Sequence, residues 1–196
     1  MKNLFFAIIP ILFIGNAVHG QTTTDNTAVV KVNIELTPFQ TIQIGSGAGA
    51  NGAVTSGYGD ELTLEYKNVE DYKNGVEKNV LKQLKVTSVG SGYKILATLS
   101  EDAQFYQEYG SGDAKVDANQ LLKISVGNKS SLDAETHMEL GSFGATSGAE
   151  SSVFEQELDV KYTGKPITDP VLLKKVLNDK TKAKYTIDVI YTIAAN

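Results

Sequence analysis

The sequence predicts an all-β fold, an antiparallel β-sandwich with one short helix. Three observations support this prediction. Apolar and polar residues alternate with a period of two in several short segments, loops rich in glycine, serine and asparagine separate these segments, and only one segment has helical periodicity. The chain lacks the alternation of strands with long helices that a parallel sheet needs.

The first twenty residues are expected to be a cleaved signal peptide. Lys2 supplies a positive charge, residues 4–14 are apolar and interrupted only by Pro10, and residues 18–20 precede Gln21 as a processing site. This apolar stretch is too short to span a bilayer, and no later stretch is long and apolar enough to do so. We therefore expect an exported protein whose mature chain begins near Gln21, with a flexible polar tail over residues 21–27 and no membrane span.

The composition narrows the class of protein. The 196-residue chain contains no cysteine, which excludes disulfides, thiolate metal sites and cysteine nucleophiles. Its net charge is −5, its lysines are dispersed and it has no arginine, so nucleic acid and anionic membranes are not expected partners. Export without disulfides fits a bacterial envelope protein, and the mature length suits one sandwich domain over residues 28–196.

The first predicted strand covers residues 29–37, where the alternation is clearest. Its apolar face consists of Val30, Val32, Ile34 and Leu36, and Pro38 then interrupts the ladder. Behind a polar N-terminal tail, such a strand is suited to insertion into the open groove of another subunit, where backbone pairing supplies affinity and side-chain pockets set the register. It is equally suited to be the first strand of the chain's own sandwich, and from this pattern alone that interpretation is favoured.

Further strands follow along the chain. Alternation resumes at Ile42 and Ile44, and a glycine-rich loop is expected over residues 45–59. The other predicted strands cover residues 62–66, 84–89, 93–99, 121–126, 132–140, 153–162 and 185–193. One face of the closing strand carries Tyr185, Ile187, Val189, Tyr191 and Ile193.

Local signals predict one turn and one helix. Gly90-Ser91-Gly92 predicts a hairpin turn between residues 84–89 and 93–99. The helix is predicted over Pro170–Leu177, with Asp169 as its N-cap and an apolar stripe along one side.

Motifs for catalysis or cofactor binding are poorly supported. Gly47-Ala48-Gly49-Ala50-Asn51-Gly52 matches a dinucleotide-binding pattern, but no helix follows to hold a pyrophosphate, so we expect a loop and no cofactor. His137 has no nucleophile near it in sequence, and no serine lies in a G-x-S-x-G elbow. We therefore expect no catalytic residues and a protein that is not an enzyme.

Two clusters of polar residues could bind a metal ion. Alternate residues of one predicted strand could offer ligands from a single face; they are Asp133, Glu135, His137 and Glu139. A glycine-bounded loop could coordinate calcium through Asp113, Asp117 and Asn119, without the spacing of an EF-hand. A solvated strand face and solvated turns are the favoured interpretation of these residues, so no metal site is predicted.

An aromatic cluster is formed by Phe105, Tyr106 and Tyr109 beside Gly110 and Gly112. It is either a ligand-facing loop tip or a plug over one end of the sandwich. The plug is the favoured interpretation, because aromatic side chains more often complete a core.

Several stretches of the chain resemble a known family. They are the N-terminal alternating strand, Leu62–Tyr66 continuing through Asp71–Val76, Leu84–Leu99 and Tyr185–Ile193. In this pattern of strands and turns the chain resembles exported pilin-type proteins of Bacteroidetes, which are similar to chaperone-usher pilins of the spore-coat-U kind. It departs from many such pilins in lacking a cysteine pair and in placing a helix at residues 170–177.

The resemblance implies an immunoglobulin-like sandwich that lacks its last strand. It further implies that a periplasmic chaperone and an usher handle the subunit and that the N-terminal strand of another copy, or of a related subunit, completes the fold. Carried over, Val30, Val32, Ile34 and Leu36 would be the donor residues. The face of the closing strand from Tyr185 to Ile193 would border the acceptor groove.

The expected function is therefore a structural subunit or adhesin of a bacterial surface fibre, present in the periplasm in transit and then at the cell surface or outside the cell. Two other functions remain open. One is a secreted module that binds glycan or peptide through the loop around Phe105 and Tyr109. The other is a metal-dependent envelope enzyme centred on His137.

Overall fold

The computed structural model describes residues 30–45, 47, 61–107, 115–144, 149–177 and 183–196. The chain divides into two units, residues 1–35 and residues 36–196, and every described helix and strand belongs to the second unit. The predicted signal peptide, the polar tail and most of the predicted glycine-rich loop lie outside the described residues.

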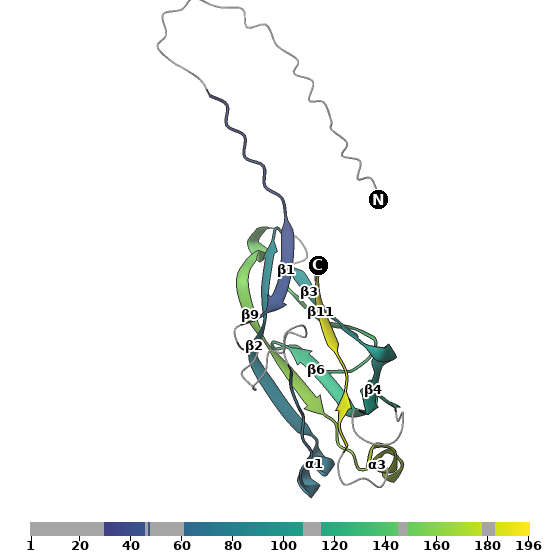
Figure 1. The fold of residues 1–196 in the computed structure, drawn as a ribbon. Helices are drawn as coiled ribbons and strands as arrows, with labels where there is room; N and C mark the ends of the chain where they lie inside the picture. Colours follow the sequence, from purple (N-terminus) through teal and green to yellow (C-terminus); the bar gives the residue numbers. More distant parts are fainter. Residues whose placement is uncertain (1–29, 46, 48–60, 108–114, 145–148, 178–182) are drawn as a thin grey trace, which may run out of the picture. The chain divides into compact units, whose positions relative to one another are not determined.

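The second unit is an antiparallel β-sandwich, which confirms the predicted fold class (Figure 1). Its larger sheet consists, in spatial order, of β1 (Phe39–Ile44), β2 (Val76–Val89), β9 (Val153–Gly164), β6 (Leu122–Val126) and β7 (Leu132–Asp133). The facing sheet consists of β11 (Val189–Ala195), β3 (Tyr93–Leu99) and β8 (His137–Phe143). A small third sheet consists of β10 (Tyr185–Thr186), β4 (Gln104–Gln107) and β5 (Lys115–Asp117).

Alternate side chains of the two main sheets meet in one apolar core. Every second residue of β3 is buried, from Tyr93 to Leu99, and β9 shows the same alternation from Leu158 onward. The largest fully buried side chains of this core belong to Tyr93, Leu84, Ile95, Ile124 and Leu140. Burying each such side chain stabilises the fold by about 1.5–3 kcal/mol, so the period-two pattern of the sequence is what holds the sheets together.

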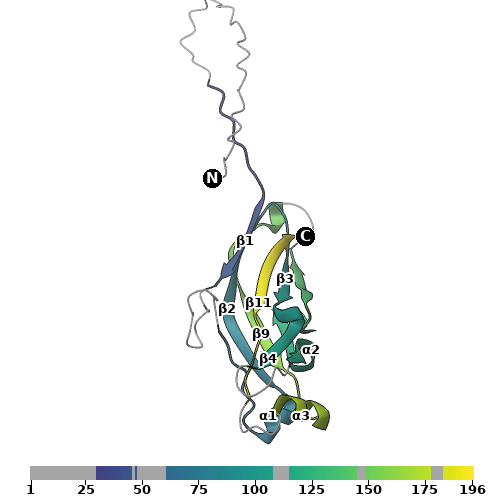
Figure 2. The same cartoon turned by 45° about the vertical axis from the view of Figure 1, so that its right-hand side comes forward.

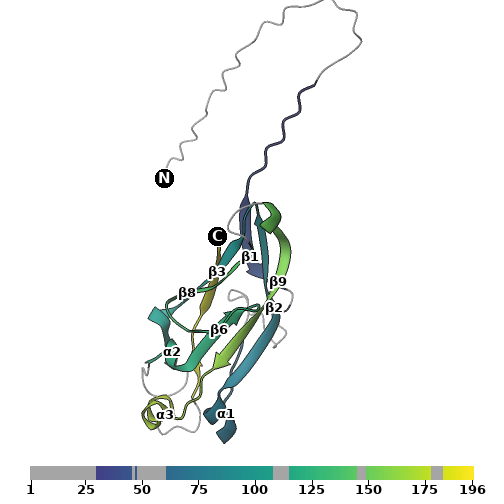
Figure 3. The ribbon, with the colours of Figure 1, turned by 180° about the vertical axis from the view of Figure 1, so that it is seen from behind.

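The predicted hairpin at Gly90-Ser91-Gly92 is wrong, because β2 and β3 belong to different sheets (Figure 3). Gly90 has a φ of +93°, and its N–H donates to Ser152 Oγ over 2.9 Å. The Ser88 hydroxyl donates to the carbonyl oxygen of Ser91 over 2.9 Å. The turn thus carries the chain from one sheet to the other. Both strands bury alternate residues in the same core, so alternation alone cannot separate a corner from a hairpin.

The predicted single strand over residues 132–140 is also wrong, because the chain changes sheets within it. Asp133 ends β7 in the larger sheet, and His137 begins β8 in the facing sheet. Between them, the N–H of buried Ala134 donates to the Leu122 carbonyl over 3.0 Å. The crossing therefore separates Asp133 from His137 and Glu139.

The predicted helix is confirmed as α3 (Pro170–Leu177). The two carboxylate oxygens of Asp169 accept the N–H groups of Val171 and Leu172 over 3.1 and 3.3 Å, as expected of an N-cap. The sequence reading missed α1 (Val69–Asn74) and the single turn α2 (Ala118–Leu121). The signal for α1 is the capping box of Asn68 and Asp71, each of which bonds the other's backbone N–H. Two further 3₁₀ turns cover Glu101–Ala103 and Ala149–Ser151.

A bulge in β2 sits beneath the first glycine of the G-x-G-x-x-G pattern. The pairing of β2 with β9 shifts between Val80 and Leu84, and Lys82 has a φ of +55°. Gly47 donates its N–H to the Lys82 carbonyl over 3.0 Å, and a Cβ at Gly47 would collide with the backbone carbonyl of Leu81. Gly47 thus allows two backbones to approach closely. The remaining glycines of the pattern lie outside the described residues.

Candidate functional site

Residues 30–38 form no β-bridge with any described strand, and pairing begins only at Phe39 (Figure 1). In the described part of the strand predicted over residues 29–37, which is residues 30–37, no strand is assigned. Its four apolar side chains are exposed: Val30 by 80%, Val32 by 77%, Ile34 by 83% and Leu36 by 87%. Four regularly spaced apolar side chains in water form a surface that gains free energy when another protein covers it.

Two edge strands of the sandwich are open to strand addition. β1 pairs only with β2 and β11 pairs only with β3 among the described strands, so each has one side without a ladder partner. Neither Phe39–Ile44 nor Val189–Ala195 contains a charged residue or proline. Long uncharged edges of this kind are templates for pairing with another chain.

The other two edges of the main sheets are protected. β7 has only two residues. β8 carries His137 and Glu139, and its pairing with β3 shifts between Ile95 and Leu96. Short length, charge and irregular pairing are the usual means by which a sheet edge avoids adding strands. Strand addition is therefore favoured at β1 and β11.

The two unprotected edges run side by side (Figure 2). Cα atoms of β1 and β11 approach to within 8 Å of one another. Hydrogen-bonded strands lie about 4.8 Å apart, so a strand between β1 and β11 needs about 9.6 Å. An inserted strand must therefore move these two edges apart by roughly 2 Å or more, whereas a strand added outside either edge needs no such movement.

The closing segment forms two strands instead of the predicted one. β10 pairs with β4, and β11 pairs with β3, with Ile187 and Asp188 between them. Four residues of the predicted face are half-buried against the main core; they are Ile187, Val189, Tyr191 and Ile193. Tyr185 instead packs on a second apolar cluster built around Val116, Ile167 and Val176. The break arises because the chain leaves the small sheet to join the facing sheet.

A chain of hydrogen bonds links β11 to the larger sheet through the core. The hydroxyl oxygens of Tyr191 and Tyr162 are 2.7 Å apart, and the Tyr162 hydroxyl donates to the side-chain oxygen of Gln83 over 2.9 Å. Burial, and then the neighbouring Tyr162 hydroxyl, raise the pKa of Tyr191 well above its ordinary value, so Tyr191 stays protonated and can donate. The sequence placed Tyr191 on the same face of the closing strand as Val189 and Ile193 but gave no indication of this hydrogen bond.

The predicted strand at residues 62–66 has the expected alternation but no ladder. Leu62 and Leu64 are half-buried against the main core, whereas Thr63 is exposed. The Tyr66 hydroxyl donates to the Lys165 carbonyl over 2.7 Å, and burial is the main cause that raises its pKa to about 12. Among the described residues this segment forms no β-bridge, and its Leu62, Leu64 and Tyr66 side chains contact the rest of the sandwich.

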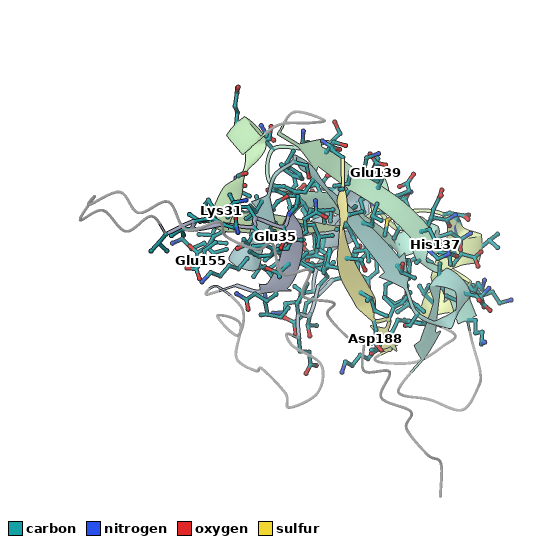
Figure 4. All side chains as sticks on the ribbon, turned by 90° about the horizontal axis from the view of Figure 1, so that it is seen from above. Lys31, Glu35, His137, Glu139, Glu155 and Asp188 are labelled. Carbon is teal, nitrogen blue, oxygen red and sulfur yellow. The ribbon has the colours of Figure 1, made fainter. Side chains whose placement is uncertain are left out.

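The predicted acidic face around His137 is divided between two sheets. Asp133 Oδ1 lies 2.9 Å from Lys165 Nζ and 3.7 Å from Lys123 Nζ, and these lysines lower the pKa of Asp133. Glu139 bonds Lys94 over 3.1 Å, which lowers the pKa of Glu139, and His137 Nδ1 lies 3.4 Å from Thr98 Oγ1 (Figure 4). Within the described residues, no three His, Asp or Glu side chains gather closely enough to hold a metal ion.

A hollow of about 450 Å³ brings Glu135 and His137 together with Asp117 and Asn119 of the predicted calcium loop. The Asp117 carboxylate accepts the side-chain N–H of Gln104 over 3.0 Å, and the Asn119 carbonyl accepts Lys165 Nζ over 2.8 Å. Asp113 lies outside the described residues. The side chain of Asp117 and the backbone carbonyl of Asn119 thus have polar partners on the protein itself.

The aromatic cluster is only partly described. Phe105 lies on β4 and is half-buried against the main core. Tyr106 also lies on β4, where its backbone pairs with Lys115 and Thr186, and Tyr109 lies outside the described residues. The position of Phe105 fits the interpretation as a plug.

A second hollow, of about 460 Å³, lies between α1 and α3. Its apolar lining includes Val69, Tyr72, Ile167 and Leu173, and lysines stand beside it at positions 67 and 73. The sequence reading missed this hollow because it did not detect α1.

No protein-family model matches the chain, and no curated protein matches it significantly. The described part of the chain contains no helix that is long and apolar enough to cross a membrane.

Proposed function

We propose that this chain is a non-enzymatic structural subunit or adhesin of a bacterial surface fibre, exported by a signal peptide and assembled by donated strands. One observation carries the proposal: an alternating apolar segment, residues 30–36, has no strand partner among the described residues and exposes its apolar face. In the fibre, this donor segment (Val30–Leu36) pairs with an unprotected edge of another copy or of a related subunit.

The donor segment and the edge of β11 match in length and in chemistry. Val30–Leu36 and Val189–Ala195 each comprise seven residues, an extended length of roughly 23 Å. Backbone pairing along β11 supplies hydrogen bonds whatever the side chains are. Alternate burial of Val30, Val32, Ile34 and Leu36 fixes the register, because a shift by one residue would place Lys31, Asn33 and Glu35 against the core.

The subunit also needs partners during its transport to the surface. An exposed uncharged edge in a crowded periplasm would pair with any available strand. A periplasmic chaperone that covers the β1 and β11 edges until an usher receives the subunit would prevent this pairing. Self-association of subunits outside the cell follows when the donor segment replaces the chaperone.

Two aspartate substitutions in the donor segment test the proposal. Ile34→Asp places a charge on the face that is expected to be buried, whereas the matched control Asn33→Asp places the same charge on the outer face. We expect light scattering to show that the wild type and Asn33→Asp assemble, whereas Ile34→Asp stays monomeric. The urea unfolding midpoint of the monomer should be the same in all three proteins. A wild type that stays monomeric at high concentration, alone and with added Val30–Thr37 peptide, would contradict the proposal.

A further inference from the structure

A hydrogen-bonded chain of three side chains crosses the apolar core from β11 to β2. The Tyr162 hydroxyl donates to the Gln83 side-chain oxygen over 2.9 Å, so the Tyr191 hydroxyl is the donor in its 2.7 Å bond to Tyr162. Gln83 is 4% exposed and Tyr162 is 6% exposed. Polar groups in a core are costly unless they are paired, so apolar residues of the same volume would serve packing at least as well.

Gln83 reaches the core only because β2 is irregular at this point. The pairing with β9 shifts between Val80 and Leu84, Lys82 adopts a left-handed conformation with a φ of +55°, and Gln83 and Leu84 are both buried although they are adjacent. In a regular strand adjacent side chains point to opposite faces. The bulge therefore aims Gln83 at Tyr162, and bulges are enriched where a strand must direct one side chain inward.

One end of this hydrogen-bonded chain lies on the unprotected edge strand β11, and the other lies on β2, next to the unprotected edge strand β1. At the β2 end, the backbone carbonyl of Gln83 accepts the N–H of Gly45, directly after the last residue of β1. At the other end, Tyr191 is the third residue of β11. When β11 moves away from β1, it also moves away from the larger sheet. This movement lengthens the hydrogen bond between Tyr191 and Tyr162.

We propose that the Tyr191–Tyr162–Gln83 chain is a latch that keeps β11 close to the larger sheet, and that a donated strand enters between β1 and β11 only after the Tyr191 bond has opened. This inference rests on the proposed function and adds its regulation. Tyr191 is thus a positioning residue for strand uptake. The latch keeps the uncharged edges together until a donor segment supplies enough new contacts to replace it.

Two hydroxyl deletions test the latch. Tyr191→Phe removes the bond that must open and keeps the ring. Tyr93→Phe is the matched control, because the Tyr93 hydroxyl makes a 2.7 Å bond to Gln156 Oε1 between the same two main sheets, on β3 instead of the edge strand β11. Both substitutions are made in the full-length Ile34→Asp chain, so that the chain's own donor segment does not compete with added peptide.

Amide hydrogen exchange of β11 and the rate of uptake of a Val30–Thr37 peptide are then measured. One buried hydrogen bond changes an opening equilibrium by roughly 2- to 12-fold. We expect β11 exchange and peptide uptake to accelerate by that factor in Tyr191→Phe, and neither to do so in Tyr93→Phe.

The outcomes distinguish the latch from the proposed function. Equal β11 exchange in the two variants overturns the latch, even if all chains bind the peptide. Faster β11 exchange in Tyr191→Phe without any peptide uptake overturns both the gating role and strand donation. Uptake that is equally fast in the parent chain and Tyr191→Phe overturns the gating role and leaves strand donation supported.

Discussion

Replacing Ile34 and, separately, Ile95 by alanine removes the same atoms from two opposite environments. Ile34 is 83% exposed, whereas Ile95 is 0% exposed in the core. We expect Ile95→Ala to lower the free energy of unfolding by about 2–5 kcal/mol, because it leaves a cavity. Ile34→Ala should change it by less than about 0.5 kcal/mol, because the side chain has no core contacts to lose.

In contrast to its small effect on unfolding, Ile34→Ala is expected to have a large effect on assembly. If Ile34 is buried in a neighbouring subunit, its three lost carbons weaken strand binding by about 2.4 kcal/mol, roughly 60-fold in the dissociation constant. Urea unfolding of dilute monomer measures the change in the free energy of unfolding. Isothermal titration of the wild-type and Ile34→Ala forms of the Val30–Thr37 peptide measures the change in strand binding. Strong destabilisation of the monomer by Ile34→Ala would show that the segment belongs to its own sandwich. Equal binding of both peptides would refute its role as a donor.

Two further predictions concern the surface and the bulge. The hydrogen bond from Lys165, together with the nearby charge of Lys123, lowers the pKa of Asp133. The ionised Asp133 therefore stabilises the fold above the unfolded pKa of about 3.9, and this stabilisation is lost as the pH falls through the lower pKa of the folded state. Asp133→Asn should therefore lower the urea midpoint at pH 7 and not at pH 2; an equal deficit at both would contradict the ion pairs as its cause. Gly47→Ala should destabilise the fold by about 1–3 kcal/mol, because its Cβ would overlap the Leu81 carbonyl, and an unchanged urea midpoint would disprove this close approach.

The fold class could be predicted because alternation with a period of two is a direct consequence of burying one face of each strand. β3, β9 from Leu158 onward and β11 from Val189 to Ile193 follow this pattern residue by residue. Asp169 and Pro170 predicted α3 for an equally local reason, since the cap needs only the next three residues.

Sheet membership could not be predicted from alternation. Gly90–Gly92 turns a corner, and residues 134–136 cross between the sheets, because a strand on either side of the core shows the same pattern. Pairing partners depend on contacts that are distant in sequence. The resemblance to pilins implied a sandwich that lacks its last strand, and it gave no indication of which edges charge and irregular pairing protect.

Only those features of the candidate site that depend on neighbouring residues in the sequence could be predicted. The alternation of Val30, Val32, Ile34 and Leu36 can be read directly from the chain, whereas their lack of a strand partner among the described residues cannot. The hydrogen bond between Tyr191 and Tyr162 was out of reach for a similar reason. It depends on a bulge at Lys82 that turns Gln83 inward, and no local signal marks that bulge.

Disulfide trapping between two copies tests strand donation most directly, because the native chain has no cysteine. One protein carries Asn33→Cys on the outer face of the donor segment, and the other carries Ile190→Cys or Thr192→Cys on the exposed face of β11. The control partner carries Glu139→Cys on the protected edge strand β8. Donation predicts rapid intermolecular disulfides with a β11 cysteine and few with Cys at position 139. Equal trapping at β8 and β11, or none at β11, would contradict the account.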